Sequence, residues 1–255
     1  MSLIKECSAD NLQVKVYETR LEMGKAAGKM AAEKIRALLE KKDEVNIIFA
    51  AAPSQNEVLD ALVEEPDIDW GRINAFHMDE YLGLSSDAPQ CFSNFLKEHM
   101  FERVPFKQVF LLTPSGDGEK ECDRYTELLK KYPVDLVCLG IGENGHIAFN
   151  DPGVAEFDDP CLVKMAKLDQ VCRMQQVHDG CFASLKEVPT HALTLTIPAL
   201  TRADHLICVV PAASKRQAVT ATVYGPVTEE VPATIMRRHK DAVLFCDGES
   251  GADIR

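Results

Sequence analysis

Short apolar runs alternate with helix-forming segments along most of this 255-residue chain. The runs that read as buried strands occupy 45–50, 73–78, 108–112, 134–141, 191–197, 205–211 and 241–247. Helical spacing and strong helix formers predict helices at 23–42, 55–65, 89–104, 119–132 and 213–224. Apolar strands separated by such helices are typical of a largely parallel sheet that is covered on both faces. We therefore predict an α/β fold in three layers, with one mostly parallel sheet in the middle.

Ligands bind at the carboxyl ends of parallel strands in folds of this class. Chemistry is therefore expected in the segments that follow residues 50, 78, 141 and 211. The segment after 141 belongs to a glycine-rich stretch, 139–153, that reads LGIGENGHIAFNDPG. Gly140, Gly142 and Gly145 formally match the GxGxxG pattern of dinucleotide-binding sites, which requires a long helix from the third glycine. Pro152-Gly153 would stop such a helix, so a nicotinamide or flavin site is not expected.

The same loop presents Asn144, His146 and Asp151 within eight residues. A single histidine in a tight turn is usually structural, but a histidine beside a carboxylate and an amide is suited to proton transfer near neutral pH. The segment 76–84, FHMDEYLGL, places Asp79 and Glu80 at the close of a predicted strand. Asp79 is therefore a candidate general base, although it could also cap a helix or loop, and His77 could belong to the core or support the site.

The balance of charge limits the class of partner. The formal net charge of −12 argues against nucleic acid and anionic membranes, which bind basic patches. A small anionic substrate is still allowed, because a few local cations can hold one phosphate. Nine scattered cysteines without a CxxC pair, and a first segment without an apolar core for a signal peptide, favour a reducing, cytoplasmic location.

Three blocks of sequence resemble the glucosamine-6-phosphate deaminase (isomerase) family. They are HMDEYLGL (77–84), GENGHIAFNDPG (142–153) and GPVTEEVPATIMRRH (225–239), and they come in the family's order and at its approximate spacing. The similarity runs from about residue 20 to 247, so we expect one deaminase-like domain over 1–255. The resemblance implies a Rossmann-like sandwich, which agrees with the alternation of elements.

The resemblance also implies an activity. Members open the ring of an amino-sugar phosphate, isomerise the aldose to a ketose and release ammonia, so we expect a deaminase/isomerase of the hydrolase type. By resemblance, Asp79 moves a proton from C2 to C1 and His146 handles the O5 proton. Asp151 and Asn144 belong to the same catalytic group, although the family usually has Glu at the first position and many members have Asp at the second. No metal and no organic cofactor is expected, because side chains perform every proton transfer.

The predicted phosphate loop departs further from the family. Members typically have Ser/Thr-Gly-Gly-Thr-Pro where this chain has AAPSQNE (51–57). Pro53 lacks an N–H group, and Ser54-x-x-Glu57 reads as a capping box that starts an ordinary helix. The expected substrate and phosphate ligands are Ala52, Ser54, Gly145, Arg173 and Lys215. Of these, Lys215 matches the family's lysine, whereas the family's lid arginine falls near His178 or Asp179 and Arg173 lies a few residues earlier.

Two other functions remain open at this point. One is a relative that isomerises or hydrolyses another sugar derivative, such as a 6-phosphogluconolactonase, whose sequences share the glycine-histidine loop but lack MDEY. The other is a sugar-phosphate sensor without catalysis, which would not require a general base. The expected partner is a small sugar phosphate, with homo-oligomerisation allowed and neither nucleic acid nor a membrane expected.

Overall fold

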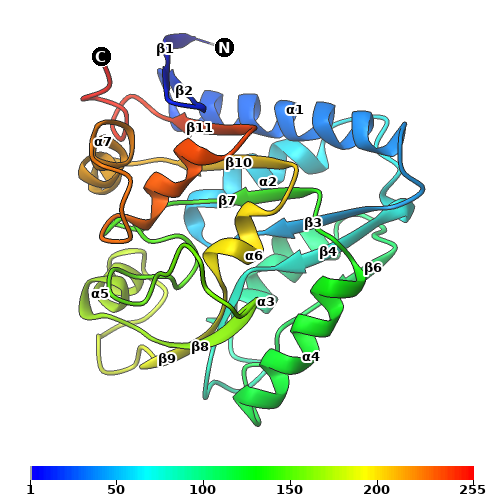
Figure 1. Ribbon diagram of the computed structural model, residues 1–255. Coiled ribbons are helices and arrows are strands. Elements are labelled where there is room, and N and C mark those ends of the chain that lie inside the picture. Colours follow the sequence, from blue (N-terminus) through cyan, green and yellow to red (C-terminus); the bar gives the residue numbers. More distant parts are fainter. Residues whose placement is uncertain (1) are drawn as a thin grey trace.

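The computed structural model of the chain describes residues 2–255 and contains two sheets (Figure 1). The larger sheet has eight strands in the order β1-β2-β11-β10-β7-β3-β4-β6. Their bounds are Leu3–Ala9, Leu12–Tyr17, Ala242–Cys246, His205–Val210, Leu136–Leu139, Val45–Phe49, Ile73–His77 and Gln108–Phe110. Every neighbouring pair is parallel except β1 with β2. The predicted α/β fold with a mostly parallel sheet is therefore confirmed.

Helices cover both faces of this sheet, which gives the three layers. One face carries α1 (Arg20–Leu39), α2 (Asn56–Val63) and α3 (Phe92–Leu96), and the other carries α4 (Gly118–Lys131), α6 (Ile197–Thr201) and α7 (Arg216–Tyr224). The strands serve both layers, because successive side chains point to opposite faces. In β3, Ile47 and Phe49 join one apolar cluster while Ile48 joins the other. Burial on both faces explains why these strands read as continuous apolar runs.

The second sheet was not expected from the sequence. It contains β5 (Asp79–Tyr81), β9 (His191–Leu195) and β8 (Val163–Lys167), all antiparallel. Asp79 therefore does not close the strand 73–78, as predicted, but begins a new strand after Met78. The run 191–197 likewise pairs outside the main sheet. Alternation of elements predicts a parallel sheet but carries no information on strand exchange of this kind.

Several local expectations also need correction. The helix expected at 89–104 begins only at Phe92 and continues as a wider turn over Lys97–Phe101. The prediction of a capping box at Ser54–Glu57 is wrong. The residues Pro53–Gln55 form a 3₁₀ turn, and neither this turn nor α2 has a side-chain cap. The Ser54 hydroxyl instead accepts from Gln55 Nε2 at 3.2 Å, and Glu57 binds Arg20 at 2.7 Å. The strands β1, β2 and β8 and the helix α5 (Gln170–His178) were missed.

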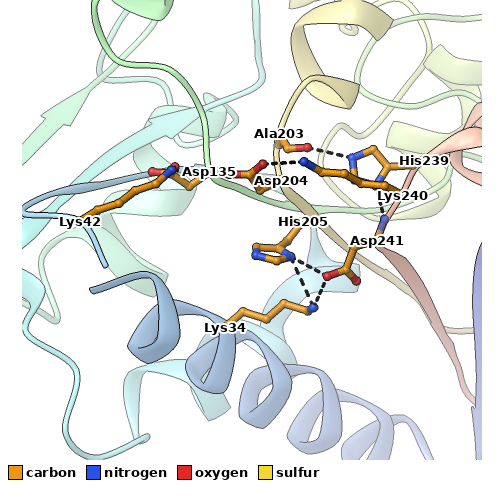
Figure 2. Close-up of polar contacts among 9 residues, drawn as sticks. All are labelled: Lys34, Lys42, Asp135, Ala203, Asp204, His205, His239, Lys240 and Asp241. Atoms are coloured by element: carbon orange, nitrogen blue, oxygen red, sulfur yellow. Dashed lines mark hydrogen bonds and ion pairs between the residues drawn. The ribbon is translucent and has the colours of Figure 1, made fainter. Parts of the chain in front are cut away.

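A polar network lies at the amino edge of the large sheet, where β7, β10 and β11 begin (Figure 2). Asp241 Oδ2 accepts from Lys34 Nζ at 2.7 Å and lies 2.6 Å from His205 Nδ1. Asp204 pairs with Lys240 at 2.7 Å, and Asp135 pairs with Lys42. We call these residues the amino-edge network; its members are Lys34, Lys42, Asp135, Ala203, Asp204, His205, His239, Lys240 and Asp241.

Two further observations concern the whole described chain. No helix within residues 2–255 is long and apolar enough to cross a membrane. All nine cysteines have free thiols, five of them buried, so the described chain contains no disulfide and the cysteines act mainly as small apolar groups.

Candidate active site

A small cavity lies at the carboxyl edge of the large sheet, where the sequence predicted the chemistry. Its volume is about 60 Å³. Ala51, Ala52 and Ser54 follow β3, Met78 and Asp79 follow β4, and Gly140, Gly142 and His146 follow β7. Gln175 and Gln176 of α5 complete the wall. Sequentially distant segments thus meet because their parallel strands end at one edge.

Asp79 is held at the junction of the two sheets. It is the first residue of β5, and its backbone pairs with Thr194 of β9. The side chain lines the cavity and is only 7% exposed. Burial, with a smaller contribution from the charge of Glu80, raises the pKa of the Asp79 carboxyl well above its ordinary value. A carboxylate that is difficult to keep ionised is a strong proton acceptor, which is the property a general base needs.

The neighbouring Glu80 has a structural task. Its carboxylate is fully buried and accepts three backbone N–H groups, from Tyr81 and Phe92 at 3.0 Å and from Ser93 at 2.9 Å. Two of these donors belong to the first turn of α3, where an anion satisfies unpaired N–H groups. Glu80 therefore ties β5 to α3 and fixes the backbone next to Asp79.

His146 is oriented by two oxygen acceptors. Its Nδ1 lies 2.7 Å from Asn144 Oδ1 and 3.0 Å from Asp151 Oδ1. Because both partners accept hydrogen bonds, Nδ1 carries the proton and Nε2 keeps its lone pair. The ring lines the cavity, so its Nε2 can accept or relay a proton there.

Asp151 is fully buried beneath the histidine. Burial alone would raise the pKa of its carboxyl, but hydrogen bonding and charge from His146, with hydrogen bonds from Asn144 and the Asp169 N–H, lower it overall. The carboxylate therefore stays ionised and stabilises positive charge on the imidazole. Asn144 and Asp151 do not line the cavity, but both contact His146 Nδ1.

Two glycines make room for this arrangement. A Cβ at Gly142 would lie 2.0 Å from His146 Cε1, so only glycine lets the imidazole pack against the loop. Gly145 has φ +87°, and its Cβ would meet Val231 at 2.8 Å. Its carbonyl accepts the Ala233 N–H at 2.9 Å, so the block 225–239 braces the histidine loop. Gly145 itself lies in this turn rather than in the cavity wall.

A possible metal ligand set coincides with the same residues. One ligand atom each from His146, Asp151 and Cys172 falls within 4.8 Å of the others. The set is poorly suited to a cation, since burial raises the pKa of the Cys172 thiol strongly and His146 Nδ1 is already hydrogen-bonded to Asn144 Oδ1. Metal-free chemistry remains our prediction.

Lys215 is not among the residues that line the cavity. The preceding Ala212 has φ +81°, which turns the chain from β10 into the 3₁₀ turn Ala213–Lys215. Lys215 Nζ is buried and has no hydrogen-bond partner among residues 2–255. Burial lowers the pKa of this ammonium, while the charges of Asp179 and Glu143 oppose that shift. An unpaired buried ammonium is costly unless an anion binds to it.

The other predicted phosphate ligands differ in whether they line the cavity. Ala52 and Ser54 line the cavity, but the loop offers few donors, because Pro53 has no N–H and the Gln55 N–H is used by Ala52 O at 2.8 Å. Arg173 points elsewhere, since its guanidinium donates to Leu185 O at 2.7 Å and Val188 O at 2.8 Å.

Sequence reasoning missed some cavity residues and left His77 undecided. Gln55 is buried, lines the cavity and donates to Val209 O at 3.2 Å, and Gln175 and Gln176 come from the unpredicted α5. Only the polar character of the pair at 175–176 on one helix face could have pointed to them. His77 is a core residue: its Nε2 accepts the Leu112 N–H at 2.7 Å, and burial lowers its pKa to about 3.

Known proteins are similar to this chain in both sequence and fold. The model of the family described as "Glucosamine-6-phosphate isomerases/6-phosphogluconolactonase" matches residues 18–245. The chain belongs to this family. A glucosamine-6-phosphate deaminase of Streptococcus pneumoniae serotype 4 is 34% identical over 242 residues, which cover 94% of this chain and 98% of that protein. The resemblance inferred from the three sequence blocks is thereby confirmed.

Solved structures of the family agree with the architecture. A monomeric glucosamine-6-phosphate deaminase superposes with a TM-score of 0.84 at 26% identity, covering 94% of this chain and 98% of that one. A 6-phosphogluconolactonase from Thermotoga maritima gives a TM-score of 0.76 at 22% identity, covering 92% and 99%. The second likeness supports the fold alone, so the choice between the two activities depends on the site.

Proposed function

We propose that this enzyme converts glucosamine 6-phosphate and water into fructose 6-phosphate and ammonia. The observation that carries the proposal is Asp79, a cavity-lining carboxyl whose pKa is raised by burial. The 34% identical deaminase supports the same substrate. The reaction needs a base for a carbon-bound proton, which is weakly acidic and requires a closely held, partly desolvated acceptor.

Each residue has a part in the proposed mechanism. His146 relays the O5 proton through Nε2 as the sugar ring opens, and Asn144 and Asp151 hold its Nδ1–H. Asp79 then takes the C2 proton and returns it to C1, which shifts the aldose toward the ketose. Water adds to the imine carbon and ammonia leaves, so the carbon–nitrogen bond is broken hydrolytically.

The phosphate subsite in this proposal lies at Lys215, with Ser54 and the backbone of Ala52 and Gly145 as further candidate ligands. Lys215 is favoured because its ammonium is buried without a partner among the described residues. Arg173 is left out because its Nη2 donates to two backbone carbonyls and the residue does not line the cavity, although its Nε is also buried without a partner among the described residues. We further propose a reducing, cytoplasmic setting, which the nine free thiols support.

The lactonase alternative is less well supported by the site. Lactone hydrolysis transfers an acyl group to water and needs no base for a carbon-bound proton, so it leaves the buried Asp79 without a use. A sensor that only binds has still less need of it. One preparation should be tested for ammonia release from glucosamine 6-phosphate and for hydrolysis of 6-phosphogluconolactone. Lactone hydrolysis without ammonia release would overturn the proposal.

A further inference from the structure

Helix α5 forms one wall of the cavity that contains Asp79 and His146. Gln175 and Gln176 of α5 form part of the wall, and the cavity of about 60 Å³ is far smaller than the roughly 300 Å³ or more of ordinary ligand pockets. The helix is held shut near its carboxyl end, where Gln175 Oε1 accepts the Glu143 N–H at 2.9 Å. The position of α5 therefore affects the shape of the cavity around Asp79 and His146.

The amino end of α5 is joined directly to the histidine network. Asp169 is the N-cap of α5, and its Oδ1 accepts the Cys172 N–H at 2.6 Å. Its other oxygen, Oδ2, accepts from Asn144 Nδ2 at 3.1 Å. The Asp169 N–H donates to Asp151 Oδ2 at 3.3 Å. One residue thus contacts the helix, the asparagine and the aspartate that together orient His146.

Asn144 is used to its full hydrogen-bonding capacity in this arrangement. Its two Nδ2 hydrogens go to Asp151 Oδ1 at 3.0 Å and to Asp169 Oδ2, while its Oδ1 accepts from the backbone N–H and Nδ1 of His146. An aspartate at 144 would have no hydrogens to donate and would face two other carboxylates. The carboxylate at 169 therefore explains why this chain has an amide at 144.

We propose that Asp169 is a positioning residue that makes closure of α5 and alignment of His146 a single event. When α5 is closed, Asp169 fixes the amide of Asn144, and the amide fixes the imidazole. When α5 opens, Asn144 loses one of its two acceptors and no longer holds the ring in one orientation. The enzyme then becomes competent for proton transfer only after the cavity is closed. This inference rests on the proposed function of His146.

The first test separates coupling from helix capping. Asp169→Ser keeps a good N-cap oxygen for Cys172, but its shorter side chain does not reach Asn144. We expect kcat for glucosamine 6-phosphate to fall roughly tenfold, the loss of one charge-assisted hydrogen bond, with KM changing less. Wild-type kcat in Asp169→Ser would overturn the proposal, because capping alone would then account for Asp169.

The second test uses a double-mutant cycle. Asn144→Asp should reduce kcat more in the wild-type background, where it brings three carboxylates together, than in Asp169→Ser, where only two remain. We expect the two backgrounds to differ by roughly tenfold, as for residues in direct contact. If Asn144→Asp lowers kcat by the same factor in both backgrounds, the two residues act independently and the proposal is overturned.

The third test does not depend on any substrate. Asn144→Ala should speed hydrogen exchange of the α5 amides, residues 170–178, by roughly tenfold, although Asn144 lies outside that helix. Asn11→Ala, at the opposite edge of the sheet, is the matched control and should change nothing in α5. Unchanged exchange in Asn144→Ala would overturn the coupling. Absence of ammonia release by the wild type would refute only the proposed function, since the exchange measurement still decides the coupling.

Discussion

The two edges of the large sheet differ in whether their charged side chains have partners. At the amino edge, each charged side chain of the amino-edge network has an oppositely charged partner, such as Lys34 with Asp241 and Lys240 with Asp204 (Figure 2). At the carboxyl edge, Lys215 Nζ is buried without a hydrogen-bond partner among residues 2–255, and Asp79 is buried with a raised pKa. The first arrangement satisfies the folded protein alone. The second is costly for the folded protein and becomes favourable only when a ligand supplies the missing charge or proton.

The comparison is tested most strongly by Asp79→Asn. We expect turnover to fall by about 100- to 10,000-fold, because an amide cannot accept the C2 proton. Thermal unfolding should show a higher midpoint at neutral pH. Since the folded-state pKa of Asp79 is raised, ionisation costs stability as pH rises through that pKa, and the amide removes the cost.

The matched control is Asp241→Asn at the amino edge. Here the same chemical change removes a paired carboxylate, so stability should fall and ammonia release should stay at the wild-type level. If Asp79→Asn keeps its turnover, or if both variants are destabilised alike, the contrast between the edges is wrong.

Lys215→Ala should raise KM for glucosamine 6-phosphate roughly ten- to a hundredfold, with a smaller change in kcat. The lost contact is one charge-assisted hydrogen bond to the phosphate. Stability without substrate should not fall, because removing an unpaired buried ammonium removes its desolvation cost. Steady-state kinetics and a melting curve on the same sample check both parts. An unaltered KM would mean that Lys215 only starts a helix.

The pH profile offers a graded test of Asp79. The base must be ionised, and burial, with a smaller contribution from Glu80, raises its pKa. We expect kcat/KM to fall tenfold per pH unit on the acid side, beginning well above the ordinary aspartate pKa of about 3.9. A profile that stays flat down to pH 5 would assign the proton transfer to another group.

A smaller effect is expected at the amino edge for Lys34→Met. The pair with Asp241 is partly exposed, so its loss should lower the free energy of unfolding by up to about 1 kcal/mol. Urea unfolding measures the change, and ammonia release should be unaffected. A loss of activity in this variant would show that the two edges communicate.

The smallest expected effect is that of a chelator. Activity should be unchanged after EDTA treatment, because Cys172 is held as a neutral thiol and His146 Nδ1 is already engaged. Recovery with zinc or magnesium after a loss would instead give the His146, Asp151 and Cys172 set a catalytic metal.

The apolar strands of the large sheet could be predicted, because a strand that is buried on both faces has a continuous run of apolar residues in its sequence. The exposed strand β1 and the mixed strand β8 give no such signal. Asp79 and His146 could be placed because strand ends converge at one edge. The coupling through Asp169 could not be predicted, since it depends on contacts with Asn144 and Asp151, which lie far from Asp169 in the sequence and which no local pattern encodes.

The single residue between the two sheets, Met78, has a consequence for how such chains tolerate insertions and deletions. Asp79 faces the cavity only while β5 keeps its register against Thr194. Because side chains alternate along a strand, removal of one residue between 73 and 81 would turn the carboxyl to the opposite face of the sheet. Several residues added to the exposed bend at 115–116 would leave that register alone. We therefore expect insertions and deletions to preserve activity only in loops that do not change the register of β5.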